Sequence, residues 1–168
     1  MSYLISHIAQ ITNASAAVVT DTKIEHLLLD SRKIYSPATS LFVAIKGVRR
    51  DGHQFIPELY KRGVRNFIIS QNIDTGTYPE ANFLLVKDSL AALQQLAAHH
   101  RQQFNIPVIG ITGSNGKTII KEWLYQLLQD DFTIVRSPKS YNSQIGVPLS
   151  VWQMNEHHTL AIFEAGIS

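Results

Sequence analysis

A glycine-rich segment in the second half of the chain has the residue types needed to hold a phosphate group. It reads Gly113-Ser-Asn-Gly-Lys-Thr118 and lies between an apolar run at 108–112 and a segment of helical periodicity at 117–129. The first N–H groups of a helix are unpaired and carry the positive end of the helix dipole, so they attract anions. Glycine at positions 113 and 116 permits backbone angles that direct several N–H groups inward. The segment therefore predicts a phosphate-binding loop.

The end of this loop predicts the rest of a nucleotide site. Lys117, the predicted catalytic residue, can reach the β- and γ-phosphates of a bound nucleotide, and the Thr118 hydroxyl can bind Mg²⁺. The general pattern has glycine where this chain has Ile111, so the loop is a variant. An ordinary glycine-rich turn is the alternative. The flanking strand and helix favour a nucleotide site formed by Gly113, Ser114, Asn115, Gly116, Lys117 and Thr118.

Composition excludes several other classes of protein. The chain has 168 residues, 45% hydrophobic and 17% charged, as expected for one large or two small globular domains. Its net charge of +2 is too small to favour nucleic acid or an anionic membrane as a partner. Cysteine is absent, which excludes disulfides and thiolate metal sites. We see no signal peptide or membrane-length apolar run, and we expect a cytoplasmic protein.

Hydrophobic periodicity predicts an α/β chain of two domains. The first part alternates short apolar runs with helical segments, and it ends in a long helix from Asp88 or Ser89 to about Phe104. The second part alternates predicted strands and helices, which favours a parallel sheet covered by helices. We therefore expect a small N-terminal α/β domain at 1–104, followed by the first part of a P-loop parallel-sheet domain at 105–168.

Several segments resemble those of the Mur ligases, a family of bacterial cell-wall enzymes, and they follow one another along the chain in the order found in that family. Thr112–Thr118 is similar to the ATP loop of the family, and Phe163–Ser168 resembles its glutamate motif. Asn142–Pro148 is similar to a segment typical of the dipeptide-adding members. Asp30–Arg32, Leu41–Gly47 and Asp51–Phe55 look like the substrate domain of the ligases that add the third residue or the terminal dipeptide.

The chain departs from the family pattern at three positions. Ile119 stands where the family often has a second threonine, and Ser140 and Ser143 stand where asparagines are common. Ile119 leaves the predicted metal ligand Thr118 intact. Because of the two serines, Asn142 is the only residue of that segment to which we assign a role. The residues after the loop are also similar to members that are fused to an alanine racemase.

The resemblance implies an ATP- and Mg²⁺-dependent peptide ligase of peptidoglycan synthesis. ATP would phosphorylate the terminal carboxylate of UDP-N-acetylmuramoyl-tripeptide, and the amine of D-alanyl-D-alanine would attack the acyl phosphate. Residues 1–104 would bind the UDP-linked substrate, and residues 105–168 would form part of the ATP-binding domain. The modified lysine, the adenine-binding residues and the C-terminal domain of the family are not among these residues, so we expect the chain alone to be inactive.

Three alternatives remain. The chain could belong to a related Mur ligase that adds the third peptide residue, to a folate-type ligase, or to a non-catalytic nucleotide-binding module. The Asp-Ser-Arg and Asp-Gly-His segments argue against the folate type, and Asn142–Pro148 favours the dipeptide-adding type. Neither the third residue of the peptide nor the oligomeric state can be predicted from the sequence.

The resemblance also assigns individual roles. A metal role falls to Glu164, as a second predicted ligand in addition to Thr118, because a carboxylate at a strand end suits Mg²⁺. Ser31 and Arg32 could hold the UDP-sugar, because arginine forks onto phosphate. Each role has a structural alternative. Arg32 and Lys46 could simply be solvated surface residues, and the loop with Asp51 and His53 could be a structural Asp-Gly turn. Glu164 could be a carboxylate that faces solvent. The full set of predicted substrate residues is Ser31, Arg32, Lys46, Asp51, His53 and Asn142.

Two other groups of residues do not predict chemistry. The pairs His99-His100 and His157-His158 do not indicate a metal site, because adjacent residues on a helix do not share a face and no acidic residue stands at ligand spacing. Trp123 and Trp152 are interpreted as packing residues.

Overall fold

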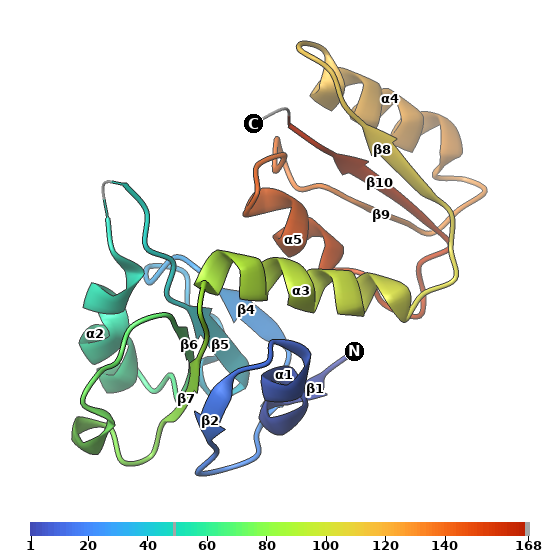
Figure 1. The fold of residues 1–168 in the computed structure, drawn as a ribbon. Coiled ribbons are helices and arrows are strands. Elements are labelled where there is room, and N and C mark those ends of the chain that lie inside the picture. The colour runs from blue at the N-terminus through green and yellow to red at the C-terminus, as the bar shows by residue number, and fades with distance from the viewer. Residues whose placement is uncertain (49, 167–168) are drawn as a thin grey trace. The chain divides into compact units, whose positions relative to one another are not determined.

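The computed structural model describes residues 1–48 and 50–166, and the chain divides into two compact units (Figure 1). They are Met1–Gln95 and Leu96–Ser168, so the division falls inside helix α3, Ser89–Gln102. The predicted domain boundary after residue 104 lies just beyond this helix and stays a prediction. Both units combine helices with parallel strands, which confirms the predicted α/β class.

A five-stranded sheet forms the centre of the N-terminal unit, in the order β2-β7-β6-β5-β4. Strands β4 to β7 run parallel and β2 is antiparallel to β7. Strands β5 and β6 are buried along their whole length, as expected when both faces of a parallel sheet are covered. The strands are β2 (Ser15–Ala17), β4 (His26–Leu28), β5 (Ser40–Val43), β6 (Asn66–Ile69) and β7 (Asn82–Leu85).

Aromatic side chains from the adjacent strands β5, β6 and β7 pack together on this sheet. Phe67 stacks on Phe83 with ring centroids 5.2 Å apart and meets Phe42 edge-on at 6.3 Å. Such pairs add about 0.5–1.5 kcal/mol beyond the burial of their area. The other elements of the unit are helices α1 (Ile5–Ile11) and α2 (Ile56–Lys61), the 3-10 turns Pro37–Thr39, Gly52–Phe55 and Thr75–Thr77, and the antiparallel pair β1 (Tyr3–Leu4) and β3 (Lys23–Ile24).

A three-stranded parallel sheet forms the centre of the C-terminal unit, in the order β8-β10-β9. Its strands are β8 (Val108–Ile111), β9 (Ile134–Arg136) and β10 (Leu160–Glu164), and its helices are α4 (Lys117–Leu128) and α5 (Gly146–Val151). The predicted alternation of strands and helices is therefore present. Because the strands are parallel, the segments that follow β8, β9 and β10 meet at one edge of the sheet.

The two tryptophans differ in their surroundings. Trp152 packs on His100, with ring centroids 4.8 Å apart, in agreement with the interpretation as a packing residue. Trp123 is 63% exposed, so the same interpretation is wrong for this residue. Helix α4 packs Leu124 and Leu128 against the apolar side chains of the sheet, and Trp123 lies on another face of the helix.

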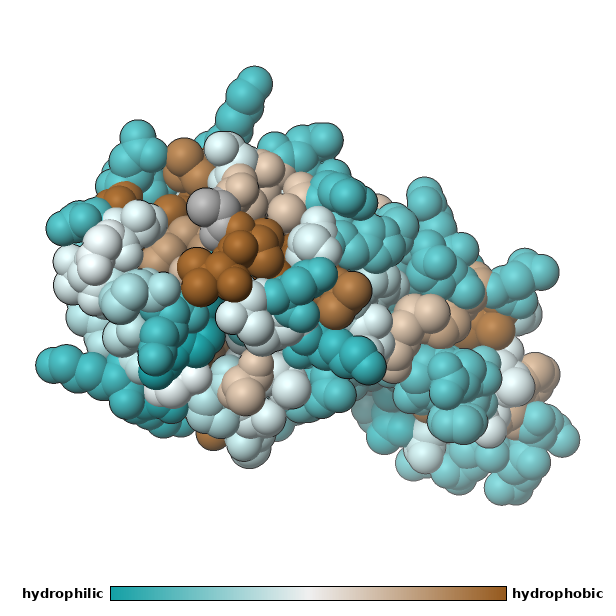
Figure 2. All heavy atoms as spheres, turned by 90° about the horizontal axis from the view of Figure 1, so that it is seen from below, coloured by the Kyte–Doolittle hydropathy of each residue, from teal (hydrophilic) through white to brown (hydrophobic). Residues whose placement is uncertain are grey.

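Hydrophilic side chains dominate the face of the molecule shown in Figure 2, where hydrophobic side chains form a patch on the N-terminal unit. Exposed large hydrophobic residues of that unit include Val18, Val19, Tyr35 and Val48. Among the helices of the described part of the chain, none combines the length and the apolar character needed to cross a membrane.

The buried histidine of α3 makes the stability of the C-terminal unit depend on pH. His100 is 1% exposed and its Nε2 lies 3.0 Å from the Met154 carbonyl oxygen. Burial lowers the pKa of His100, and the Met154 hydrogen bond only partly opposes this. Below about pH 6.5 the unfolded chain takes up a proton more readily than the folded chain, so stability is lost as the pH falls.

We expect the free energy of unfolding to fall between pH 6.5 and 5.5, by no more than about 1.4 kcal/mol for the one proton that His100 takes up on unfolding. The substitution His100→Gln should make this decrease smaller, because glutamine can donate to the Met154 carbonyl but does not titrate. Urea unfolding at pH 7.5, 6.5 and 5.5 measures the effect. Since burial also lowers the pKa of His158, part of the decrease should remain in the variant. An identical pH dependence in both proteins would contradict the prediction.

Candidate functional site

The predicted phosphate loop connects β8 to α4 with the geometry that a phosphate cradle needs. Gly113 has φ 137° and Gly116 has φ 77°, in the region that favours glycine, and Gly116 is the N-cap of α4. Within residues 1–48 and 50–166, no atom lies within 4 Å of the position that a Cβ would take at either glycine. Ser114 and Asn115 are exposed. The loop therefore presents the free N–H groups of a 12-residue helix to open space.

The two functional side chains of the loop have different partners. Lys117 Nζ donates to the carbonyl oxygen of Gly113 at 2.6 Å, so the side chain folds back across the loop. Thr118 Oγ1 donates to Glu164 Oε2 at 3.1 Å. This second contact joins two residues that are 46 positions apart and that were predicted separately as metal ligands. They meet because β10 lies beside β8, with Glu164 opposite Ile111.

The surroundings of Glu164 fit a divalent cation. Its side chain is fully buried, and Oε1 has no hydrogen bond of acceptable geometry, although the Lys121 ammonium lies 2.9 Å away. Two hard oxygen atoms, from a threonine and a carboxylate, suit Mg²⁺, which commonly keeps water and phosphate oxygens as its other ligands. In the described residues no group of three or more His, Cys, Asp or Glu could hold a metal by itself.

The segment after β9 closes against the glutamate motif. Gly166 N–H donates to the Asn142 carbonyl oxygen at 2.6 Å, and a Cβ at position 166 would lie 2.7 Å from that oxygen. The structure thus brings predicted residue Asn142 next to the motif that contains Glu164. The last two residues of that motif, Ile167 and Ser168, lie outside the described part of the chain.

At the edge of the N-terminal sheet, Arg32 is paired with its own neighbour. Its Nε and Nη2 each donate to one oxygen of Asp30 at 2.8 Å, and this fork holds the pKa of Asp30 at about 2. The Arg32 side chain is 80% exposed. The Ser31 carbonyl oxygen accepts from Arg62 at 2.6 Å. A phosphate contact by Arg32 would thus require the guanidinium to leave or share Asp30.

Asp51 and His53 form a hydrogen-bonded network that spans two loops. Although burial raises the pKa of Asp51, hydrogen bonds from the backbone and ring of His53 and from Gln71 outweigh it and hold the pKa at about 2. His53 Nδ1 lies 2.6 Å from Asp51, and its Nε2 accepts from Ser70 N–H at 3.0 Å. Since both ring nitrogens have partners within the chain, His53 and Asp51 are suited to shaping the loop. Lys46 is exposed and bridges to Asp51 through the backbone.

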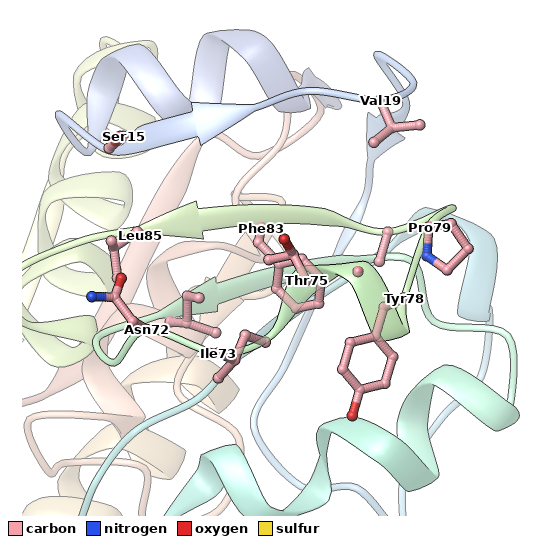
Figure 3. A pocket seen from close by; sticks show the side chains of 12 residues that line it. Ser15, Val19, Asn72, Ile73, Thr75, Tyr78, Pro79, Phe83 and Leu85 are labelled. Atoms are coloured by element: carbon pink, nitrogen blue, oxygen red, sulfur yellow. The ribbon is translucent and has the colours of Figure 1, made fainter.

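A separate cavity of about 360 Å³ lies in the N-terminal unit (Figure 3). Phe83, Tyr78 and Ile73 contribute much of its apolar wall, and Asn72, Thr75 and Ser15 contribute polar atoms. None of the predicted substrate residues is among its lining residues. The predicted site instead follows the ends of β4 and β5, where Ser31, Arg32 and Lys46 lie.

Lys121 is the main residue at the predicted nucleotide site to which the sequence assigned no role. It is fully buried beside Glu164. Its position three residues after Thr118 was a usable signal, because residues three apart on a helix lie on the same face. A lysine at this position lies on the same face of the helix as Thr118, and therefore near the predicted metal ligands. Its apolar neighbours Ile119, Ile120 and Trp123 obscured this signal.

Known families match most of the chain. Residues 23–101 match the family described as "Mur ligase family, catalytic domain", and residues 111–168 match "Mur ligase middle domain". Relatives named UDP-N-acetylmuramoyl-tripeptide--D-alanyl-D-alanine ligase are similar over nearly its whole length. The relative from Synechocystis sp. is 35% identical over 163 residues, 97% of this chain and 34% of the relative. The relative from Bacillus subtilis is 35% identical over 147 residues, 88% of this chain and 32% of the relative.

Solved structures agree with these matches. MurF from Acinetobacter baumannii has a TM-score of 0.90 at 30% identity, covering 99% of this chain and 36% of that protein. MurF from Thermotoga maritima in complex with ADP has a TM-score of 0.72 at 31% identity, covering 84% and 32%. The chain spans about a third of the length of the curated relatives that it matches. From the phosphate loop, the glutamate beside it and both family matches, we conclude that the chain belongs to the Mur ligase family.

Proposed function

We propose that this chain supplies the UDP-substrate unit and part of the nucleotide unit of an ATP-dependent ligase that joins D-alanyl-D-alanine to UDP-N-acetylmuramoyl-tripeptide. The observation that carries the proposal is the contact of Thr118 with Glu164 beside a glycine loop that is open to solvent. The names of the relatives support this reaction in peptidoglycan synthesis, and the ADP in the T. maritima structure supports the nucleotide. Because ATP and the UDP-linked tripeptide are both nucleotides, we expect the reaction to take place in the cytoplasm.

The reaction would proceed in two steps. The terminal carboxylate of the peptide attacks the γ-phosphorus of ATP, the bond from this phosphorus to the β-phosphate oxygen breaks, and an acyl phosphate and ADP form. The amine of D-alanyl-D-alanine then attacks the acyl carbon, loses a proton and displaces phosphate. Phosphoryl transfer depends mainly on positioning and on neutralising charge. The N–H groups at the start of α4 would cradle the phosphates, and Lys117 would exchange the Gly113 carbonyl for a phosphate oxygen.

Thr118 and Glu164 would be the protein ligands of Mg²⁺, which supplies charge neutralisation on the phosphates when it is bound. The contact between them places both oxygens on the same side of the loop. Asn142, next to Gly166 at the same edge of the sheet, is suited to approach the peptide end of the substrate.

In the N-terminal unit, Arg32 and Lys46 are exposed and follow the ends of the parallel strands β4 and β5, where α/β proteins bind ligands. We assign Ser31, Arg32 and Lys46 to the phosphates and sugar of the UDP-linked substrate. Asp51 and His53 support these contacts by holding the loop between β5 and α2 in shape.

Titration calorimetry of the 168-residue chain tests the proposal. We expect the chain to bind ADP with Mg²⁺ and, separately, UDP-N-acetylmuramoyl-tripeptide, but to release no ADP when both substrates and ATP are present. Arg32→Gln should weaken binding of the UDP-linked substrate about tenfold, the value of one charged hydrogen bond. Lys33→Gln, which removes the neighbouring exposed charge, is the control. Absence of binding to either ligand, or an equal effect of the two substitutions, would contradict the respective assignment.

A further inference from the structure

A buried lysine lies directly behind the nucleotide loop. Lys121 is 0% exposed and stands on α4, one turn after Thr118. An ammonium group is costly to bury unless charged and hydrogen-bonding partners surround it. The partners of the Lys121 ammonium therefore indicate the role of this buried charge.

Those partners come from three segments of the C-terminal unit. Lys121 Nζ donates to the carbonyl oxygen of Ser137 at 2.8 Å and to that of Lys139. It also lies 2.9 Å from Glu164 Oε1 and 3.2 Å from Glu122 Oε1. The ammonium thereby joins α4 to β10 and to the segment that follows β9.

The two oxygens of the Glu164 carboxylate consequently have different neighbours. Oε1 lies toward the ammonium, and Oε2 accepts from Thr118. The backbone of Glu164 is held through the same group of residues, because its N–H donates to Ser137 Oγ at 3.0 Å while Lys121 binds the Ser137 carbonyl. Lys121 thus restrains both the side chain and the backbone of the glutamate.

We propose that Lys121 is a positioning residue that holds Oε1 of Glu164 and thereby presents Oε2, together with Thr118 Oγ1, to the metal ion of a bound nucleotide. The inference rests on the proposed nucleotide role of this loop and extends it to a residue outside the loop. Charge balance agrees with it. A buried glutamate with an adjacent ammonium is close to neutral, and the Thr118 side of the carboxylate remains available to a cation that arrives with phosphate.

A purely structural role would have a different signature. If Lys121 only neutralised a buried charge, its loss would weaken nucleotide binding equally with and without metal. A positioning role instead predicts a loss that appears only when Mg²⁺ is present. The removal of a group that orients a metal ligand typically lowers metal affinity about 10- to 100-fold.

The test measures ADP affinity of the 168-residue chain by calorimetry in Mg²⁺ and in EDTA. We expect the increase in ADP affinity caused by Mg²⁺ to be about 10- to 100-fold smaller in Lys121→Met than in the unsubstituted chain, with the affinity in EDTA unchanged. Lys121→Gln, which keeps a donor for the Ser137 carbonyl, should show the same loss and serves if the methionine variant does not fold. Glu122→Gln removes the other carboxylate near the ammonium and should retain the full Mg²⁺ effect. An undiminished Mg²⁺ effect in both Lys121 variants would overturn the proposal.

A second measurement needs no ligand. Because Lys121→Met leaves a buried carboxylate without its cation, the double variant Lys121→Met/Glu164→Gln should unfold at a higher urea concentration than Lys121→Met alone. A double variant whose loss of stability equals the sum of the two single losses would show that the two residues are not coupled, and would also overturn the proposal. If the unsubstituted chain bound no ADP under either condition, the proposed function would fail, whereas the urea comparison would still decide the pairing.

Discussion

Replacement of Lys117 with methionine is expected to weaken the binding of ADP and ATP by about 10- to 150-fold. The estimate follows from about 1.5–3 kcal/mol for a hydrogen bond to a charged group. Lys117 donates to the carbonyl oxygen of Gly113 in its own loop, and it is partly exposed. Its substitution therefore removes a phosphate contact without leaving a buried charge unpaired, and the fold should be retained.

Calorimetry with ADP and Mg²⁺ measures this effect, and the midpoint of urea unfolding shows whether the fold is unchanged. The matched control is Lys139→Met, which removes a lysine charge elsewhere in the same unit. The side chain of Lys139 has no assigned role, since Lys121 binds only its carbonyl. Equal affinities of the Lys117 variant and the unsubstituted chain would show that the loop does not use this lysine for phosphate.

A second large effect is expected at Gly52, which packs against the backbone of Ala44 and Ile45, directly after β5. A Cβ at this position would lie 2.8 Å from the Ile45 nitrogen and 3.0 Å from Ala44 Cα, closer than such atoms approach in folded proteins. Because both neighbours are backbone atoms, the loop must shift to admit a methyl group. We expect Gly52→Ala to lower the free energy of unfolding by about 1–3 kcal/mol, the usual cost of overpacking.

The same loop offers a matched control. Among the residues that the structure describes, a Cβ at Gly47 would meet the Arg50 carbonyl oxygen at 3.4 Å, an ordinary contact, so Gly47→Ala should change stability by no more than about 0.5 kcal/mol. Because Gly52 lies between Asp51 and His53, Gly52→Ala should also disturb their hydrogen bonds and weaken binding of the UDP-linked substrate. Urea unfolding and calorimetry measure the two effects. Equal stability of the two alanine variants would contradict the packing argument.

A substrate role for Asp51 and His53 depends on which of their polar atoms are not used in hydrogen bonds within the protein. Their hydrogen bonds connect the loop after β5 to Ser70 and Gln71 after β6. This arrangement favours the structural alternative for these two residues, with Lys46 carried on the exposed part of the loop. Their assignment to substrate contacts stays a prediction, and the Gly52 variant tests whether the shape of the loop matters for binding.

Several features of the protein could be predicted because they depend on neighbouring residues alone. The glycines of Gly113–Thr118 are needed for positive φ angles, and a strand followed by a helix positions the loop whatever the rest of the chain does. The long helix α3 and the strands β5, β6 and β8 were predictable for a similar reason, because continuous apolar runs and helical periodicity are local signals. Strands of two residues, such as β1 and β3, carry no periodicity and were not predicted.

The partners and the exposure of individual side chains could not be predicted in the same way. The fork between Arg32 and Asp30 competes with phosphate, and the sequence cannot show which partner the guanidinium takes. Trp123 was expected to pack, yet the orientation of α4 on its sheet leaves it exposed. In both cases the outcome depends on geometry that arises only when the elements are assembled.

The sequence by itself determined which residues are available for chemistry in this protein: a predicted phosphate loop, a lysine and a threonine at its end, and a glutamate after a buried strand. The tertiary structure alone decided how these residues meet. Strand β10 lies between β8 and β9, so Glu164 comes to lie beside Thr118 and the ends of the other two strands. The same arrangement encloses Lys121 with Glu164, because a charge that would be solvated on an isolated helix becomes buried when the helix packs on the sheet, and must then be paired.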